Sequence, residues 1–369
     1  MPQTSDKKPE FPFEVPSYED WAQVAREELN GADPLEKLSI RKGDLEILPF
    51  YSAPQQALGG NHTLRPSANS HYGARSWANV PRILVTDEKK ANQEALTYLN
   101  AGAEGILFDF QSSEINPVIL LDKIMLTDCS ISFIAGKSLS QWVQHFASYA
   151  ESNFNVNEVK GSIFWRTDSG NHADIIRSFQ QWPHYYSLGM IVQPHTDVTD
   201  EIAQALHKVV ALTNTLFAEK VLPETTLNQI SFSVSVGTDF FLEIAKIKSL
   251  RNLWRQIRGA YGLKNDQHLH IHAHSLPWVN DAFQPHGNMI KSTTAAMAAI
   301  AGGCDSLTVE PEDNTSNSTS RIARNVSSIL REESHFSKVA DPTAGSYYLE
   351  SLTDQLSEKA WLKFQSLTK

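Results

Sequence analysis

RILVTDEKKANQEALTYLNAGAEGILFDF, residues Arg82 to Phe110, holds two β-rich runs with a segment of helical length between them. RILVTD and EGILFDF are short and apolar, as strands are, while KKANQEALTYLNAGA carries its apolar residues at helical spacing. The order strand, helix, strand is the repeating unit of an α/β protein. This stretch therefore predicts the α/β class.

The same alternation continues to about residue 311. Segments such as SLSQWVQHFASYAESNF, DEIAQALHKVVALTNTLFAEK and NMIKSTTAAMAAIAGG separate successive strand candidates. Eight strands with eight intervening helices predict a (β/α)₈ TIM barrel, a fold of about 250 residues. The strand candidates are RILVTD, EGILFDF, CSISFIAG, GSIFWRT, YSLGMIVQP, NQISFSVSVG, HLHIHAHS and CDSLTVEP.

Two further parts flank the predicted barrel. Residues 1–70 are rich in Pro, Gly, Ser and Asn and hold one helical piece, SYEDWAQVAREELNG, which Ser17 can cap and Gly31 can end. We assign them to an extended arm with a helix, and residues 71–369 to the barrel with a C-terminal helical tail. In the tail, Asp341 and Gly345 of DPTAGS predict a turn between two helices. Whether Lys369 is the natural end is left open.

Composition excludes several classes of protein. Of the 369 residues, 41% are apolar and 20% charged, and the net charge is -10, which argues against a nucleic-acid partner. No run approaches twenty apolar residues, and MPQTSDKKPEFPFEVPSYEDW has no features of a signal peptide, so we expect a cytoplasmic protein without membrane spans. Cys129 and Cys304 are expected to be buried and unpaired.

HLHIHAHSLPW, His268 to Trp278, places four histidines on one face of a strand and Leu269, Ile271 and Ala273 on the other. A metal site would need a third ligand beyond a His-x-His pair, and nothing nearby supplies one in a recognisable spacing. We expect no metal. The histidines become polar groups inside the barrel, the apolar set faces the helices, and the lumen is filled. Aromatic residues that crowd the strands are Phe108, Phe110, Phe133, Phe164, Trp165 and Phe232.

Three longer segments resemble the methylmalonyl-CoA mutase family. ARSWANVPRILVTDEKKANQEALTYLNAGAEGILFDF is similar to the opening of that family's barrel, and SFSVSVGTDFFLEIAKIKSLRNLWRQI to its sixth strand and helix. SRIARNVSSILREESHFSKVADPTAGSYYLESLTDQLSEKAW matches its Arg-Ile-Ala-Arg-Asn helix and its Asp-Pro-x-x-Gly-Ser-Tyr turn. The blocks cover roughly residues 72 to 365. The resemblance implies a barrel that, in active relatives, holds an acyl-CoA in its lumen for an adenosylcobalamin-dependent rearrangement.

The polar groups that this resemblance implies for the substrate are only partly present. On the seventh strand the family has His-Ser-Gln, whereas this chain has His274, Ser275 and Leu276. On the fourth strand the family's Thr and Gln become Ser162 and Phe164. On the sixth strand Ser231 matches, but the family's aromatic residue two positions on is a serine here, Ser233.

The other carried-over positions are similarly incomplete. Tyr72, ahead of Arg75, corresponds to the family's substrate tyrosine, and His195 to its assisting histidine, without the Glu-Ala-Gly that should follow. The carboxylate-binding arginine falls near Asp174, where the charge is reversed. We therefore interpret Tyr72, His195 and His274 as relics of catalytic positions, and Arg75, Ser162 and Ser231 as relics of substrate contacts. None is expected to be catalytic.

The resemblance as a whole implies the non-catalytic small subunit of a heterodimeric methylmalonyl-CoA mutase, which assembles with and stabilises a large catalytic subunit. The family's cobalt-binding Asp-x-His-x-x-Gly motif is absent from these residues, so we expect adenosylcobalamin in the partner and no cobalamin-binding domain here. Exposed aromatics of the arm are the expected contacts with the partner. They are Phe11, Phe13, Tyr18 and Trp21.

Three questions stay open at this point. An isolated chain can be a homodimer. The chain can instead be an acyl-CoA-binding isomerase barrel that works with a separate cobalamin-binding chain. A metal-dependent hydrolase that uses His272 and His274 is a third alternative.

Overall fold

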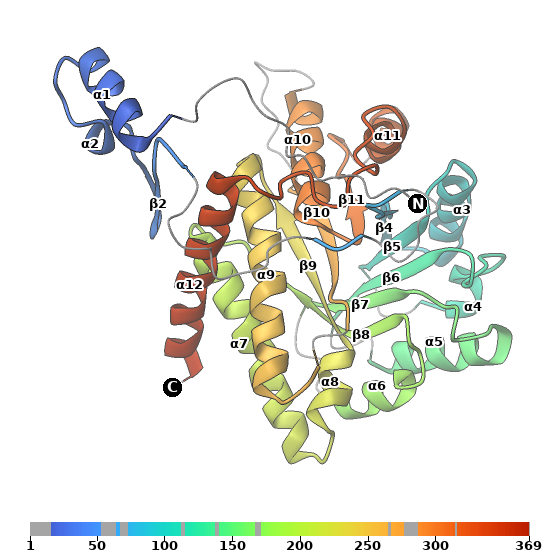
Figure 1. The fold of residues 1–369 in the computed structure, drawn as a ribbon. Coiled ribbons are helices and arrows are strands. Elements are labelled where there is room, and N and C mark those ends of the chain that lie inside the picture. The colour runs from blue at the N-terminus through green and yellow to red at the C-terminus, as the bar shows by residue number, and fades with distance from the viewer. Residues whose placement is uncertain are drawn as a thin grey trace, which may run out of the picture.

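The computed structural model describes residues 16–52, 64–66, 73–111, 115–136, 140–166, 171–264, 267–276, 287–313 and 316–368. Within these ranges, a nine-stranded parallel sheet is surrounded by helices (Figure 1). Its order is β3-β11-β10-β9-β8-β7-β6-β5-β4. The strands are β3 (Ala78–Asn79), β4 (Arg82–Val85), β5 (Gly105–Phe110), β6 (Ser130–Ala135), β7 (Gly161–Trp165), β8 (Tyr185–Ile191), β9 (Ile230–Val236), β10 (His270–Ser275) and β11 (Ser306–Thr308).

The sheet closes on itself because β3 and β4 are two halves of one strand. β3 pairs with β11 and β4 with β5, and only Val80 and Pro81 lie between the halves. Val80 N donates to Leu307 O at 2.9 Å, and Leu107 N donates to Pro81 O at 3.0 Å, so both neighbours stay bonded across the gap. Pro81 has no N–H to contribute, which interrupts the ladder at that residue. The ring therefore has eight strands in the described part of the chain, and the predicted (β/α)₈ barrel is confirmed.

Each barrel strand leads into a helix, as the sequence predicts. A short α8 (Pro223–Asn228) is added after α7, and the tail helix α12 (Tyr347–Thr368) packs against α7 and α9. The helices that follow the strands are α3 (Glu88–Asn100), α4 (Pro117–Leu120), α5 (Ser140–Asn153), α6 (His172–Phe179), α7 (Val198–Ala218), α9 (Phe240–Ala260), α10 (Gly287–Gly302) and α11 (Asn317–Glu332).

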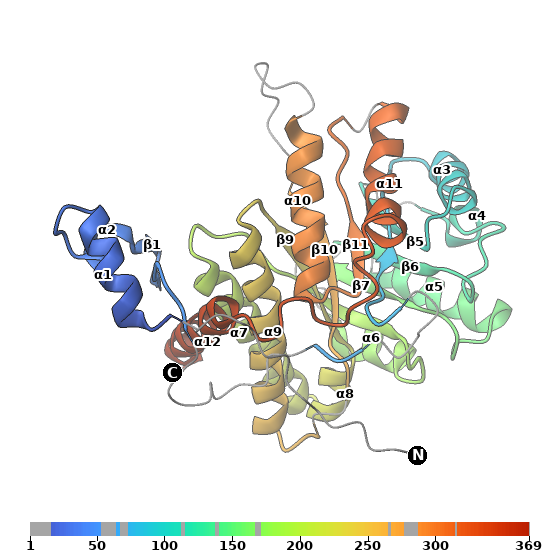
Figure 2. The same cartoon turned by 45° about the horizontal axis from the view of Figure 1, so that its top comes forward.

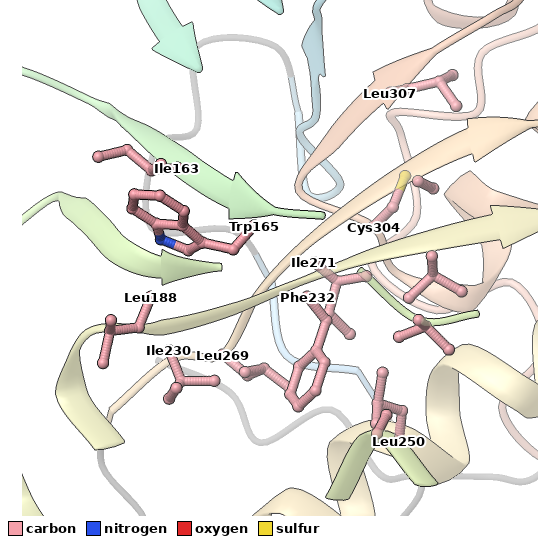
Figure 3. Close-up of a cluster of buried hydrophobic side chains, with 14 of the residues drawn as sticks. Ile163, Trp165, Leu188, Ile230, Phe232, Leu250, Leu269, Ile271, Cys304 and Leu307 are labelled. Carbon is pink, nitrogen blue, oxygen red and sulfur yellow. The ribbon is translucent and has the colours of Figure 1, made fainter. Parts of the chain in front are cut away.

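The main hydrophobic core lies between the strands and the helices. Phe232 on β9 and Ile271 on β10 face Leu250 on α9, as Figure 3 shows. Leu269, Ile271 and Ala273 all belong to this core, which confirms that this parity of β10 faces the helices. Both cysteines are free; Cys304 is buried in this core and Cys129 is half-buried at its edge.

The turn before α12 is fastened to the barrel by an ion pair. Lys248 of α9 lies 2.9 Å from Asp341, and both side chains are buried. Asp341 also accepts from Thr343 N at 3.0 Å, and Gly345 follows with φ +82°, a left-handed conformation that suits glycine. The predicted turn at Asp341 and Gly345 is confirmed.

The N-terminal elements form a small unit at one side of the barrel (Figures 1 and 2). They are α1 (Tyr18–Glu28), α2 (Pro34–Leu38) and the antiparallel hairpin of β1 (Ile40–Lys42) and β2 (Leu45–Ile47). Ser17 caps α1: its hydroxyl accepts from Asp20 N at 3.1 Å, and the Asp20 carboxylate accepts from Ser17 N at 3.0 Å. α1 ends where expected, since Gly31 follows with φ +90°. Among the described helices, none is both long and apolar enough to cross a membrane.

Candidate functional site

One half of the barrel lumen is filled by apolar side chains. Val80, Leu107 and Phe164 form a buried cluster of their own, separate from the core under the helices, and Ile134 and Ile191 pack against it. Phe164 has 0% of its surface exposed and its ring lies 5.4 Å from that of His272 across the lumen. Phe164, which stands where the family has a glutamine, thus occupies the lumen.

The aromatic residues that crowd the strands differ in which side they face. Phe164 alone among them faces the lumen. Sequence parity left open which of them point inward. The other five belong to the core between strands and helices; they are Phe108, Phe110, Phe133, Trp165 and Phe232. Phe133, for example, stacks on Phe108 at 6.0 Å and contacts Trp142 of α5 at 4.8 Å. The lumen is filled by fewer rings than the sequence suggests, and by aliphatic residues instead.

The other half of the lumen is polar and belongs to β9, β10 and β11. His270, His272 and His274 alternate along β10 and stand beside serines of β9 in the sheet register. His270 Nε2 lies 3.2 Å from Ser306 Oγ, and His274 Nδ1 lies 3.4 Å from Ser233 Oγ. The predicted role as interior polar groups bonded to neighbouring strands is confirmed for these three histidines. It is wrong for His268, which precedes β10, is exposed and lies 2.5 Å from Asp305.

The hydrogen bonds of His272 determine which ring nitrogen carries the proton. The Thr308 hydroxyl donates to Val80 O, so toward His272 Nε2, 3.3 Å away, it can only accept. Nε2 is therefore protonated, and in a neutral ring Nδ1 accepts from the Ser306 hydroxyl at 3.0 Å. Ser306 in turn accepts from His270 Nε2. The result is one directed chain from His270 to Val80 O, with both rings as neutral Nε2–H tautomers.

Burial keeps these rings neutral. Burial lowers the pKa of His270 to about 4. It also lowers the pKa of His274 to about 4, and the nearby positive charge of Arg82 adds to the effect on His274. The pKa of His272 is lowered well below its ordinary value by burial and by its two histidine neighbours. At neutral pH the three imidazoles thus serve as neutral hydrogen-bonding groups of a packed interior.

Four charged residues form a network across the lumen. Arg82 begins β4, and the other three lie at or after the carboxyl ends of their strands. Asp109 of β5 is 1% exposed and lies 3.1 Å from Arg82; it also bonds Arg166, which follows β7. Arg82 reaches Glu310, after β11, at 2.8 Å. Two arginines and two carboxylates cancel in charge. This mouth network lies at the end of the barrel where enzymes of this fold bind their substrates.

The mouth network was not predicted, although the sequence carries a signal for it. In each of four strand segments, one charged residue has the parity of the lumen residues. The segments are RILVTD, EGILFDF, GSIFWRT and CDSLTVEP, and the residues are Arg82, Asp109, Arg166 and Glu310. A second unpredicted group lies nearby: the buried ammonium of Lys246 on α9 is 3.1 Å from Glu201 of α7 and 2.6 Å from Glu243. It ties two helices to the same end of the barrel.

The predicted site residues are not all brought together. Ser162, Ser231 and His274 share the lumen, where the two serine hydroxyls are fully buried and have no hydrogen-bond partner in the described structure. His195 is exposed on the loop after β8, and its backbone N donates to Glu201 at 3.2 Å. Arg75 lies at the opposite end, just before β3, where its guanidinium donates to Arg65 O at 3.0 Å. These positions do not form one catalytic group.

The remaining positions are accounted for separately. Asp174 lies in α6 at the surface, where it pairs with Arg177. Tyr18 and Trp21 of α1 cluster with Phe50, with ring centroids 6.3 Å and 5.1 Å from it. Tyr72, Phe11 and Phe13 lie outside the described residues. Among the residues that are described, no cluster of three or more His, Cys, Asp or Glu has the geometry of a metal site.

Comparison with known proteins relates the chain to one family. Residues 190–369 match the family model described as methylmalonyl-CoA mutase. The chain is 30% identical to the methylmalonyl-CoA mutase small subunit of Porphyromonas gingivalis, over 96% of this chain and 63% of that protein. It is 33% identical to the probable small subunit of Mycobacterium tuberculosis and 37% identical to the small subunit of Streptomyces virginiae. These two alignments cover 50% and 39% of this chain, and 31% and 24% of the relatives. The chain thus spans less than two thirds of each relative's length.

Proposed function

We propose that the chain, whose residues 190–369 match the methylmalonyl-CoA mutase family model, is the non-catalytic small subunit of a heterodimeric, adenosylcobalamin-dependent mutase. In this proposal a large subunit interconverts methylmalonyl-CoA and succinyl-CoA. This chain assembles with that subunit and stabilises it, with residues 1–70 as the subunit-contacting arm and residues 71–369 as the barrel and tail.

The filled lumen is the single observation that carries the proposal. A catalytic barrel of this family needs an open lumen lined by groups that bond the acyl-CoA. Here Val80, Leu107 and Phe164 occupy one half, and the hydrogen-bond capacity of His272 in the other half is used by Ser306 and Thr308. Admitting a thioester would require removal of this packing and of the mouth network, at a cost of several kcal/mol. The geometry is that of a barrel interior packed for stability.

Cobalamin is the cofactor of the family, and the lumen histidines do not fit its lower ligand. A cobalt-binding histidine must present a free nitrogen outside the barrel. His270, His272 and His274 instead face the lumen and contact hydroxyls of neighbouring strands. In our proposal the cofactor is therefore held by the partner, and this chain contributes no step to the rearrangement.

Calorimetry on the isolated chain tests the proposal. We expect no heat of binding for methylmalonyl-CoA, succinyl-CoA or free CoA up to about millimolar concentration, which corresponds to a binding free energy weaker than about -4 kcal/mol. A purified catalytic mutase subunit, titrated in the same buffer, is the positive control. Micromolar binding to this chain would contradict the proposal and favour the alternative, an acyl-CoA-binding isomerase barrel that works with a separate cobalamin-binding chain.

A further inference from the structure

The hairpin of β1 and β2 sits against the chain's own barrel. Its tip, residues 42–45, lines a cavity of about 310 Å³ together with the loops that follow β8 and β9. Asp44 N donates to Asp197 Oδ2 at 3.3 Å. Gly43, with φ +56°, allows the close approach, because a Cβ there would lie 2.6 Å from the same Asp197 oxygen. The tip is shaped to the end of the barrel that carries the mouth network.

Three lysines join the hairpin to the rest of the chain. Lys42 of β1 pairs with Asp239 at the start of α9, and Lys359 of α12 donates to Asp44 O. The third, Lys363, contacts the most carboxylates. Lys363 of α12 lies 2.9 Å from Asp44 of the hairpin, 3.2 Å from Asp197 at the start of α7 and 3.0 Å from Asp200 of α7. Burial alone would lower the pKa of Lys363, but the hydrogen bonds that its ammonium donates to the three carboxylates outweigh burial and raise the pKa above its ordinary value. One positive charge therefore holds three negative ones together.

Apolar contacts also contribute to this attachment, and Tyr51, after the hairpin, packs on Tyr348 of α12 with ring centroids 5.1 Å apart. Leu45 is the buried side chain of the hairpin, at 2% exposure, and Ile47 packs beside the core. All three residues of β1 are exposed, and Ile40 has 54% of its surface open to solvent. Without Lys363, the carboxylate of Asp44 would face those of Asp197 and Asp200 with no cation between them. The docked position of the hairpin thus depends both on burial of Leu45 and on the positive charge between these carboxylates.

We propose that Lys363 is a charge-dependent latch that holds the N-terminal arm on the barrel of its own chain. Loss or screening of the Lys363 charge releases the hairpin and, with it, α1 and α2, which precede it. The latch is a property of this chain alone. Only its consequence, a released arm that is free to contact a large subunit, rests on the proposed function.

Hydrogen exchange measured by mass spectrometry on the isolated full chain tests the latch. In Lys363→Gln, we expect exchange of peptides that cover β1 and β2 to rise by up to about fivefold, the effect of an ion pair of this kind. Exchange in β5 to β7 stays unchanged. In the native chain, raising salt from about 0.1 M to about 1 M, where the screening length falls from ~10 Å to ~3 Å, raises hairpin exchange in the same way.

Three variants keep the test specific. Lys363→Arg retains the charge and should protect the hairpin as the native chain does. Asp200→Asn added to Lys363→Gln removes part of the repulsion and should restore protection. Lys208→Gln changes the same charge at an exposed position of α7 and should have no effect. Unchanged hairpin exchange in Lys363→Gln overturns the proposal, and so does a rise that spreads equally through the barrel strands. Because no acyl-CoA and no partner is used, a negative result leaves the proposed function unaffected.

Discussion

At the scale of single residues, the lumen histidines show how burial sets chemistry. An imidazole that is open to water is half charged near pH 6.5, whereas His270 and His274 are neutral down to about pH 4. Removal from water lowers these pKa values. The hydrogen-bond partners of both rings are hydroxyls, which do not stabilise the charged imidazolium as a carboxylate would. A side chain that commonly transfers protons thus becomes a fixed donor and acceptor in a packed interior.

This neutrality predicts acid sensitivity. Between the unfolded pKa of 6.5 and the folded pKa of about 4, the unfolded chain binds more protons than the folded one. These histidines therefore do not lower the free energy of unfolding above about pH 6.5. As the pH drops below that value, the free energy of unfolding falls by about 1.4 kcal/mol per pH unit for each such histidine. Urea unfolding at several pH values between these limits measures the slope.

Variants assign that slope to the lumen. His270→Gln and His274→Gln should each make the pH dependence shallower, whatever they cost at neutral pH. His184→Gln, at an exposed position before β8, is the matched control and should leave the slope unchanged. Equal slopes in all variants would show that the acid sensitivity arises outside the lumen.

At the scale of elements, the mouth network joins strands that are distant in the chain. Asp109 connects β5 to Arg82 of β4 and to Arg166 after β7, and Arg82 connects β4 to Glu310 after β11. Each contact links one strand, or the residue that follows it, to another strand around the ring. The network therefore closes the barrel at the end where catalytic relatives need access.

Removal of the central carboxylate tests how much this closure stabilises. Asp109→Ala leaves Arg82 and Arg166 without a shared partner and should lower the free energy of unfolding by about 3 kcal/mol, as expected for one side of a buried pair. Asp174→Ala removes the exposed pair with Arg177 on α6 and should cost no more than about 1 kcal/mol. Chemical denaturation of both variants gives the comparison. Equal losses would mean that the mouth network acts as an ordinary surface pair.

At the scale of the whole molecule, a barrel closed by its own side chains carries a separate small unit at one side (Figure 2). Tyr18 is exposed on that unit, and Trp21 is partly covered by Phe50. Because aromatic side chains dominate the affinity of many protein interfaces, this is where we expect a partner to bind.

Co-purification with the catalytic mutase subunit measures that contact. In Trp21→Ala and Tyr18→Ala, we expect the affinity for the large subunit to fall by at least about tenfold, the loss of about 1.4 kcal/mol that an interface aromatic commonly contributes. Phe217→Ala is the matched control, because Phe217 is 60% exposed near the end of α7, away from the arm. If all three variants retain native affinity, the arm is not the interface.

The sequence by itself determined the elements of this protein. Strand and helix periods, the cap at Ser17 and the turn at Asp341 depend on residues a few positions apart, so they can be identified without the rest of the chain. The alternation of His270, His272 and His274 likewise determined that all three share one face of a strand. Eight such units were enough to predict the barrel.

Only the tertiary structure decided what each strand face contacts. Both faces of a barrel strand are buried, so hydrophobicity does not distinguish them, and Phe164 turned inward while Phe232 turned to the helices. Ring closure brought Arg82 to Glu310 across 228 positions, and Asp44 to Lys363 across a comparable separation. Such pairs depend on how distant elements pack, which no local pattern contains, and they decide that the lumen is closed and that the arm is held.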